Sequence, residues 1–415
     1  MATKPTVAAA DKMGFVRGRT LAADRHVSQK PRLSKEALLG ARSVHTAKGM
    51  RVAIVHDWLI GGGAELVVEE LHKLFPNAPI FTSYCTPEWR ERLDNKVVTG
   101  WLQHLGKIRK FIPFLRVWWF THINLKEYDL VISSSGAEAK GIKVSRDTLH
   151  VNYCHAPTHY YWSRYDEYME HPGFGMFDWL ARLGLKTLVW PLRRWDYKAA
   201  QRPDYMIANS NHTAKEIKKY YGRDAVVIFP PVNVARFQKK KPAGHVRHGF
   251  VISGRQTPYK RFDLAVKACT RFNFPLTVIG DGPDNMRLRR LAGKTVNFVG
   301  RVSDEVIEEE FANAKALIFP GTDDFGITAV EALAAGTPVV AYEAGGALDY
   351  VVPGKTGEFF SEPTAASLAD ALHRSNLRSF NHEGIATKAM AFAPKVFDEE
   401  LEKFLKVILS DRGPG

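Results

Sequence analysis

The stretch GTDDFGITAVEALAAGTPVVAYEAGGALDYV (residues 321–351) follows the apolar run ALIFP and contains a second apolar run, PVVAY. Between these two runs lie a glycine turn with acidic residues and a helical pattern that starts near Gly326. Apolar runs that alternate with helical patterns are typical of βαβ units in a parallel sheet. The stretch therefore predicts an α/β fold with free backbone N–H groups at the mouth of the helix, where anions bind.

The same alternation extends along the rest of the chain and identifies two α/β halves. Strand-like runs occur at 51–55, 79–84, 129–135, 149–155, 205–210 and 225–231, and again at 249–254, 275–280, 296–300, 316–321 and 338–342. A polar, turn-rich stretch around 230–249 separates the two series. We therefore predict two doubly wound sheets, one in residues 50–232 and one in 233–395, followed by an amphipathic helix at about Glu399–Leu409.

Length and composition exclude several protein classes. A chain of 415 residues is long enough for two or three domains, and 45% hydrophobic with 25% charged residues is typical of a globular protein. Three widely spaced cysteines exclude a disulfide scaffold and a paired-cysteine zinc site, and they favour a reducing compartment. No apolar run approaches the roughly 18 residues of a membrane span. The net charge of +14 indicates anionic partners.

Residues 1–49 are strongly basic, with ten Lys or Arg against three Asp or Glu. They show no apolar periodicity and lack the apolar centre of a secretory signal. A start codon assigned too far upstream, an organellar transit peptide and a disordered basic arm all fit this composition. In each case the folded part begins near Met50, which precedes the strand-like RVAIV.

Three turns carry residues that could bind a ligand. Gly61–Gly63 lie between a strand and a helix, where the backbone can approach an anion, although a tight turn without a ligand also explains them. In SGRQTPYKR (253–261), Arg255 and Lys260 follow a strand, which suits a diphosphate or simply a solvated basic turn. In the opening stretch, Asp323 and Glu331 could accept sugar hydroxyls. There Asp324 could instead be a helix N-cap, and Glu331 a surface charge.

Taken together, these segments resemble the retaining, nucleotide-sugar-dependent glycosyltransferases of family four. The likeness rests on that family's Glu-x7-Glu signature at Asp323 and Glu331, with FG after the first acid and EAxAxGxPVVA from the second. The motifs HDWLxGGGAE, CHxPxxYxW, GRxxPYKRxDLAxxA, VIGDGP and FxGR agree with it. Over residues 50–410 the resemblance implies the GT-B architecture, two Rossmann-like domains facing across a cleft. A closing helix within 396–415 would return to the first domain.

The resemblance also implies a role for each matching residue. Arg255 and Lys260 would bind the donor diphosphate and stabilise charge on the leaving nucleotide. Glu331 would bind the ribose and Asp323 would face the transferred sugar. The other implied contacts are His155, donating to a sugar hydroxyl near the reacting centre; the backbone of Phe325, Gly326, Ile327 and Thr328, holding sugar and phosphate oxygens; Gly62 and Gly63, approaching the diphosphate; and Arg301, lining the base. A capped or core histidine is the alternative for His155.

One residue departs from the family pattern. The first signature acid is usually Glu, and here it is Asp323, whose side chain is one methylene shorter. The carboxylate keeps its charge but could miss a sugar hydroxyl by about one bond length. Since misplacement of that order can cost about 100-fold in rate, either the donor sits differently or the activity is weak.

A basic, aromatic stretch indicates a membrane surface. WLQHLGKIRKFIPFLRVWWFTHINLK (101–126) holds five Lys or Arg, no acid and six Trp or Phe. This composition suits the headgroup zone of an anionic bilayer, as does the second candidate, LKTLVWPLRRW (185–195). Core aromatics beside solvated lysines are the alternative. Single-stranded nucleic acid is another alternative, but no nucleic-acid module accompanies these aromatics.

The sequence thus predicts a glycosyltransferase that moves a hexose from a nucleotide diphosphate sugar to a glycan or lipid-linked acceptor. The DFGITAVEA and GGALDYV segments most resemble mannosyltransferases, so GDP-mannose is the favoured donor and UDP-sugars stay open. We expect no metal, no other cofactor and no nucleic acid as partner, and a cytoplasmic location at an anionic membrane surface. The alternatives are a non-catalytic nucleotide-sugar-binding protein, suggested by Asp323, and a nicotinamide oxidoreductase, suggested by Gly61–Gly63.

Overall fold

The computed structural model of the protein describes residues 49–105, 113–170, 178–238 and 246–410. The predicted basic extension, residues 1–49, lies outside these ranges except for its last position. Residues 411–415 of the predicted closing segment also lie outside them, as do three cations of the basic aromatic stretch, Lys107, Arg109 and Lys110.

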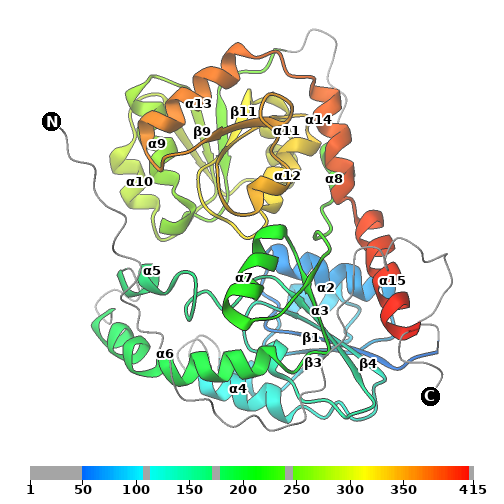
Figure 1. The fold of residues 1–415 in the computed structure, drawn as a ribbon. Helices are drawn as coiled ribbons and strands as arrows, with labels where there is room; N and C mark the ends of the chain where they lie inside the picture. The colour runs from blue at the N-terminus through cyan, green and yellow to red at the C-terminus, as the bar shows by residue number, and fades with distance from the viewer. Residues whose placement is uncertain (1–48, 106–112, 171–177, 239–245, 411–415) are drawn as a thin grey trace. The chain divides into compact units, whose positions relative to one another are not determined.

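The first half of the chain folds around a parallel sheet of seven strands in the order β3-β2-β1-β4-β5-β6-β7. Figure 1 labels β1, β3 and β4 of this sheet. The strands are β1 (Val52–His56), β2 (Ile80–Thr82), β3 (Val97–Thr99), β4 (Leu130–Ser135), β5 (Leu149–Cys154), β6 (Tyr205–Ala208) and β7 (Val226–Val227). Every residue of β1, β4 and β5 is buried, as expected where helices cover both faces of a parallel sheet. The strand order reverses between β1 and β4, and the loops after the two strands at such a reversal are where open α/β sheets bind ligands.

The helices of this half begin and end at recognisable local signals. They are α2 (Gly63–Leu74), α3 (Pro87–Arg92), α4 (Pro113–His122), α5 (Tyr165–Glu170), α6 (Asp178–Ala200) and α7 (Asn211–Tyr221), with a 3-10 turn, η2, at Ala139–Gly141. Ser210 caps α7 by accepting a hydrogen bond from the backbone N–H of Thr213, and Gly222 ends it in the left-handed conformation. Helix α6 continues through Pro191, although proline cannot donate the helical hydrogen bond.

The second half folds around a parallel sheet of six strands in the order β10-β9-β8-β11-β12-β13. The strands are β8 (Phe250–Ser253), β9 (Leu276–Ile279), β10 (Val296–Gly300), β11 (Ala316–Phe319), β12 (Val339–Tyr342) and β13 (Gly357–Phe360). The order reverses between β8 and β11. The loops that carry Lys260 and Asp323 follow these two strands, so both loops lie at the reversal point of the second sheet, where such sheets bind ligands.

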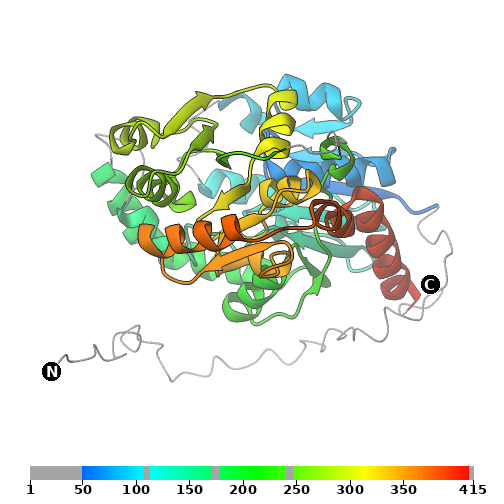
Figure 2. The ribbon, with the colours of Figure 1, turned by 90° about the horizontal axis from the view of Figure 1, so that it is seen from above.

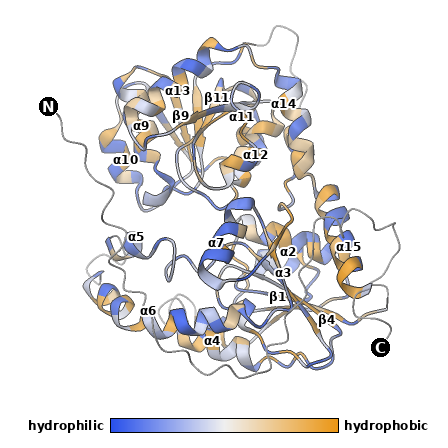
Figure 3. Ribbon diagram, viewed as in Figure 1, coloured by the Kyte–Doolittle hydropathy of each residue, from blue (hydrophilic) through white to orange (hydrophobic). Residues whose placement is uncertain are grey.

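Helices pack on both faces of the second sheet. They are α8 (Val234–Phe237), α9 (Phe262–Arg271), α10 (Asn285–Leu291), α11 (Asp304–Asn313), α12 (Ile327–Ala334), α13 (Ala365–Leu377) and α14 (His382–Ala389). Alternate residues of β11 enter different cores, because successive side chains of a strand point to opposite faces. Helices α9 and α13 lie side by side on one face (Figure 2), and α12 and α14 pack on the other. Apolar residues concentrate along the strands (Figure 3).

The last helix, α15 (Pro394–Ser410), packs on the first half of the chain. Its Phe397 ring lies 5.9 Å from the ring of Tyr153, and its Phe404 ring lies 6.0 Å from that of Tyr205. The expected return of the closing helix to the first half is therefore confirmed. The domain boundary between residues 232 and 233 stays a prediction.

The α/β class and the parallel sheets are confirmed, and the sequence runs located most of the strands. Two strands were missed, β3 (Val97–Thr99) and β13 (Gly357–Phe360). Both are edge strands whose apolar runs stop after two residues, whereas the equally short β2 lies in the longer predicted run 79–84.

Candidate active site

The glycine turn after β1 is held by a carboxylate from its own helix. Glu65 accepts hydrogen bonds from the backbone N–H groups of Ile60 and Gly61, at 3.3 and 3.1 Å. Gly61 has φ +102°, a left-handed conformation that favours glycine. Gly62 is the N-cap residue of α2, and Gly63 lies so close to Ile327 that a Cβ at residue 63 would fall 2.5 Å from the Ile327 Cδ1. The structure thus brings the predicted glycines against the predicted donor helix.

Lys260 and Asp323, predicted to bind the diphosphate and the sugar, form an ion pair. The Lys260 Nζ lies 3.0 Å from the Asp323 Oδ2, and both side chains are largely buried. Burial alone lowers the pKa of Lys260, but the neighbouring Asp323 carboxylate outweighs it and raises the pKa overall. The other carboxylate oxygen of Asp323, Oδ1, is buried and has no hydrogen-bond partner within the described ranges. One acceptor at this position is therefore free for a ligand.

Two predicted cations of the second half are solvent-exposed. Arg255 follows β8 and Gly254, and its guanidinium makes no hydrogen bond to the described part of the chain. Arg301 follows the edge strand β10. Both side chains can therefore reorient towards a ligand at the carboxyl ends of the strands.

The segment from Phe325 to Thr328 forms the start of α12. Gly326 is the N-cap residue with φ +97°, and a Cβ there would fall 2.5 Å from the Tyr350 hydroxyl. The side chain of Phe325 is buried in the core, and its carbonyl accepts a hydrogen bond from the Tyr350 hydroxyl at 2.8 Å. Ile327 and Thr328 occupy the first turn, where backbone N–H groups lack helical acceptors. The N-cap alternative for Asp324 is wrong, because Gly326 occupies that position.

Glu331 lies one turn into α12 and is half-buried. Burial raises the pKa of its carboxyl to about 7, and the nearby Arg236 opposes this only in part. Arg236 is itself paired with Asp304 at 3.0 Å and with Glu308 at 2.7 Å. Near neutral pH the carboxyl of Glu331 is thus about half ionised before any ligand arrives.

His155 directly follows β5 and hydrogen-bonds to a serine of β4. Its Nε2 lies 2.7 Å from the Ser134 Oγ, while the Nδ1 of His56 donates to the Ser134 carbonyl at 2.7 Å. Burial first, and then the neighbouring His56, lower the pKa of His155 to about 3. The imidazole is therefore neutral at physiological pH, which suits a hydrogen-bonding role rather than a charged one.

Two further residues near this site, His159 and Arg164, were not predicted from the sequence. His159 Nε2 lies 2.8 Å from the Asp324 Oδ2, and Arg164 donates to the Thr322 carbonyl at 2.8 Å. The Arg164 guanidinium also lies over the Tyr259 ring, 4.1 Å from its centroid. Both residues lie in or just beyond the CHxPxxYxW motif, which was the available signal. They join the loop after β5 to the loop after β11.

Beside the Thr322–Asp324 loop lies a cavity of about 770 Å³. Its lining includes His159, Arg164, Tyr259, Thr322 and Asp324, but not Lys260, Asp323 or Glu331. The cavity is therefore adjacent to the predicted donor residues rather than formed by them.

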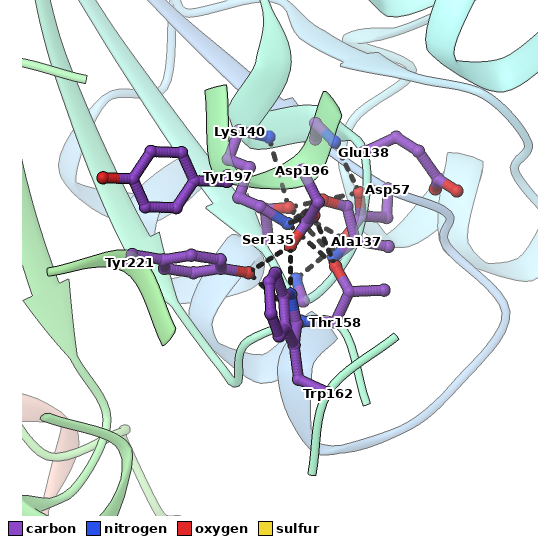
Figure 4. Close-up of polar contacts among 12 residues, drawn as sticks. Asp57, Ser135, Ala137, Glu138, Lys140, Thr158, Trp162, Asp196, Tyr197 and Tyr221 are labelled. Atoms are coloured by element: carbon purple, nitrogen blue, oxygen red, sulfur yellow. Dashed lines mark hydrogen bonds and ion pairs between the residues drawn. The ribbon is translucent and has the colours of Figure 1, made fainter. Parts of the chain in front are cut away.

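A buried polar network fixes the loop that carries His155 and His159 (Figure 4). The Lys140 Nζ lies 2.7 Å from the Asp196 Oδ1, and neither side chain is exposed. Asp196 also accepts hydrogen bonds from Thr158, Trp162 and Tyr221 at 2.7–2.8 Å. Because buried ionic groups are tolerated when they are paired and hydrogen-bonded, this network can hold the loop rigidly against α6 and α7.

Asp57, the aspartate of the HDWL motif, has a structural role. Its carboxylate accepts hydrogen bonds from the backbone N–H groups of Gly136, Ala137 and Ala139 at 2.7–2.9 Å, and from the Ser135 hydroxyl (Figure 4). These bonds occupy both oxygens, so Asp57 shapes the turn after β4.

Part of the predicted membrane stretch is core. Arg116, counted there among five surface cations, is buried and lies 2.7 Å from Glu138. Phe120 is fully buried, whereas Phe114 and Trp118 are exposed. The interpretation of Arg116 as a lipid-facing cation is therefore wrong, because the period of α4 turns it towards the 3-10 turn η2.

Two family models match the chain next to one another. The model described as Glycosyltransferase Family 4 matches residues 61–236, and that described as Glycosyl transferases group 1 matches residues 234–376. This chain belongs to the family 4 glycosyltransferases. The matched ranges contain the glycine turn, His155, Lys260 and the Asp323–Glu331 signature.

Curated relatives of this chain agree with that family. It is 31% identical to the D-inositol 3-phosphate glycosyltransferase of Streptomyces bingchenggensis over 41% of the chain and 45% of the relative. It is 33% identical to the GDP-mannose-dependent alpha-mannosyltransferase of Mycolicibacterium smegmatis over 28% of the chain and 30% of the relative. It is 24% identical to the alpha-1,3/1,6-mannosyltransferase alg2 of Schizosaccharomyces pombe over 74% of the chain and 70% of the relative. The chain spans less than half the length of the first curated relatives it matches.

Solved structures share the fold of this chain. Sucrose-phosphate synthase from Thermosynechococcus elongatus superposes with a TM-score of 0.64 at 17% identity, covering 87% of this chain and all of that one. Anabaena Alr3699/HepE in complex with UDP superposes with a TM-score of 0.62 at 18% identity, covering 86% and 100%. At these identities the likeness establishes the architecture alone, which agrees with the expected GT-B arrangement.

Two features are absent from the described ranges of the chain. These ranges contain no helix both long and apolar enough to cross a bilayer. They also contain no group of three or more His, Cys, Asp or Glu side chains arranged to hold a metal ion. The expected metal independence stays a prediction.

Proposed function

We propose that this chain transfers a hexose from a nucleotide diphosphate sugar to a glycan or lipid-linked acceptor, with retention of configuration. The observation that carries the proposal is the Asp323 carboxylate. One of its oxygens binds Lys260, and the other is buried without a hydrogen-bond partner among the described residues. A buried acceptor without a donor costs free energy. A hydroxyl of the transferred sugar would satisfy it.

The proposed step exchanges one bond at the anomeric carbon for another. The bond to the diphosphate oxygen breaks while the acceptor hydroxyl oxygen attacks from the same face, and the hydroxyl proton passes to the departing oxygen. Lys260, Arg255 and the N-terminus of α12 offset the negative charge that grows on the diphosphate. Because these groups supply positive charge, we propose that the reaction needs no metal and persists in EDTA.

The other predicted residues would position the donor. Gly62 and Gly63 would let the backbone approach the diphosphate, and Glu331 would accept hydrogen bonds from the ribose hydroxyls. Arg301 would line the base. His155 would donate one hydrogen bond to a sugar hydroxyl, since its lowered pKa keeps the ring neutral.

Mannose from GDP-mannose is the donor we favour. The relatives named above include a GDP-mannose-dependent alpha-mannosyltransferase and a second mannosyltransferase, whereas a structural neighbour binds UDP. A donor-panel hydrolysis assay with GDP-mannose, UDP-glucose, UDP-galactose and UDP-N-acetylglucosamine tests this choice. Fastest release of GDP supports it, and faster release of UDP from any other donor overturns it.

The same assay separates the remaining alternatives. The non-catalytic alternative, motivated by Asp323, gains if the chain binds a nucleotide sugar but releases no nucleotide from any donor in the panel. The nicotinamide oxidoreductase alternative does not survive the family membership.

We further propose peripheral association with an anionic membrane, on the cytoplasmic side. Helix α6 exposes apolar side chains along one stripe, with Trp179 and Trp190 63% and 69% exposed. Lys186 and Arg194 are exposed at helical spacing from them, and apolar and polar residues are interspersed along this helix in Figure 3. Aromatic side chains beside cations suit the headgroup zone of an anionic bilayer. The exposed Phe114 and Trp118 of α4 would add to this surface.

A further inference from the structure

The cavity beside the Thr322–Asp324 loop has a chemistry that the donor assignment leaves unused. Its volume of about 770 Å³ lies within the range of small-molecule sites, about 300–1,000 Å³. Residues of α7, of α5 and its preceding loop form one wall, and residues that follow β8, β9 and β11 form the other. It thus lies at the carboxyl ends of parallel strands, where α/β sheets bind ligands.

The cavity borders the loop that carries Asp323, the residue predicted to face the transferred sugar. Thr322 and Asp324 both line the cavity. Asp323 stands between them, with its Oδ1 buried and unpartnered within the described ranges. A molecule in the cavity would therefore approach the donor sugar from beside this loop.

The lining is acidic, although the whole chain carries a net charge of +14. Six carboxylates and three guanidinium groups line the cavity, with Glu167, Glu170 and Glu216 on the wall formed by α5 and α7. Two of the guanidinium groups are already paired with acids of the same lining: Arg261 with Asp263 at 3.0 Å, and Arg287 with Asp284 at 2.6 Å.

The third guanidinium group is also engaged. Arg164 stacks on Tyr259 and donates to the Thr322 carbonyl. The two arginine–aspartate pairs also occupy Asp263 and Asp284, and Asp324 is paired with His159. The three glutamates of the α5 and α7 wall then face one guanidinium group, so the lining keeps an excess of carboxylates.

We propose that this cavity binds the saccharide part of the acceptor and that this saccharide is uncharged; the inference rests on the proposed glycosyl transfer. Carboxylates accept hydrogen bonds from pairs of sugar hydroxyls. A uronate or phosphate on the bound saccharide would instead face carboxylates of like charge. This repulsion would strongly disfavour the binding of a charged saccharide. The phosphate of a lipid-linked acceptor would stay outside the cavity.

A matched pair of sugars tests the inference. Methyl α-mannopyranoside and methyl α-mannopyranosiduronate, in which the C6 hydroxymethyl group is a free carboxylate, differ in charge by one unit. Ligand-observed NMR on the full chain measures the affinity for each. We expect at least tenfold tighter binding of the mannoside. Equal affinities, tighter binding of the uronate, or no binding of the mannoside would overturn the proposal.

Isosteric variants locate the binding. Glu216→Gln should weaken mannoside binding several-fold. It should also reduce the ratio of the affinity for the mannoside to the affinity for the uronate. Glu309→Gln makes the same chemical change at an exposed position of α11 outside the cavity lining, and it should change neither. Glu170→Gln serves as the second cavity variant if Glu216→Gln lowers the thermal midpoint. Identical behaviour of the cavity variants and the control would contradict the assignment.

Donor hydrolysis measured on the same samples separates this inference from the proposed function. Absence of hydrolysis with every donor would count against the proposed transfer. Normal hydrolysis without a preference for the neutral sugar would overturn the cavity assignment alone.

Discussion

Gly63 at the start of α2 lies directly against Ile327 at the start of α12. A Cβ at residue 63 would fall 2.5 Å from the Ile327 Cδ1, well inside van der Waals contact. Helix α2 follows a strand of the first sheet and α12 follows a strand of the second. The N-termini of both helices were predicted to hold the donor diphosphate. The contact therefore makes a single methyl group a sensitive probe of the site.

We expect Gly63→Ala to weaken donor affinity at least tenfold, because the added methyl must displace Ile327 and with it the start of α12. Adding Ile327→Val removes the Cδ1 methyl and should restore much of the affinity. Titration of the donor by calorimetry measures both. As control, Gly184→Ala adds a methyl where nothing lies within 4 Å. It should leave affinity unchanged and stabilise α6 by about 0.5–1 kcal/mol. Absence of rescue would contradict the contact.

Lys260→Ala should lower turnover by 100-fold or more. An interaction of a few kcal/mol with the developing diphosphate charge would disappear. Steady-state kinetics with saturating donor measures the effect. Lys218→Ala breaks an exposed ion pair with Asp224 and should change turnover little, since surface pairs contribute about 0–1 kcal/mol to stability. Near-normal turnover of Lys260→Ala would remove the diphosphate assignment.

Asp323→Glu should retain or raise activity, and Asp323→Asn should lose most of it. Glu restores the residue usual in the family and keeps the charge beside Lys260, whereas the amide of Asn loses that charge and puts a donor group in place of one acceptor oxygen. Transfer rates of the three proteins decide between these outcomes. If Asn serves as well as Asp, the carboxylate does not contact the sugar.

Donor affinity should fall as the pH decreases through about 7, the raised pKa of the Glu331 carboxyl. Protonation converts one acceptor oxygen into a donor, so a ribose hydroxyl loses its partner. Glu331→Gln should weaken donor binding at pH 8 and flatten its dependence on pH. Donor titrations at pH 6, 7 and 8 measure both. A wild-type affinity independent of pH would show that Glu331 does not bind the donor.

The same group should affect stability in the opposite direction. The folded state holds this proton up to about pH 7, whereas the unfolded carboxyl loses it near its ordinary pKa of 4.5. The free energy of unfolding should therefore fall as pH rises from about 4.5 to 7. Glu331→Gln removes the cost of burying the charge and should be more stable at pH 8 by about 1–3 kcal/mol. Urea unfolding at pH 5 and pH 8 measures the difference, and equal wild-type and variant slopes with pH would refute it.

Protein starting at Met50 should bind anionic vesicles reversibly and neutral vesicles poorly. The binding should weaken as salt rises, because the Debye length shrinks from about 10 Å at 0.1 M to about 3 Å at 1 M. The Trp179→Ala/Trp190→Ala variant should sediment less with anionic vesicles. Leu377→Ala changes an apolar residue that is 88% exposed in the second half and should behave as wild type. Equal sedimentation of all three would place the membrane surface elsewhere.

Local patterns were enough to predict much of the fold. The alternation of apolar runs and helical segments located most strands of both sheets, because side-chain period depends on neighbouring residues alone. The glycine turn, Lys260 and Asp323 were also identifiable, since each follows a strand. The structure placed Lys260 beside Asp323 and Gly63 beside Ile327, two pairs that the sequence had assigned to one site without showing their contact.

Tertiary structure alone decided the rest. His159 and Asp324 are 165 positions apart, yet they lie 2.8 Å from each other. Arg116 belongs to a basic stretch of the sequence, yet its side chain is buried and paired with Glu138. The acidic cavity likewise combines residues from loops that are far apart along the chain. No local period or spacing encodes these contacts, because they arise only when whole sheets and helices pack. The sequence therefore determined which elements form and where anions could bind, while packing determined which charges are paired, buried or left to meet a ligand.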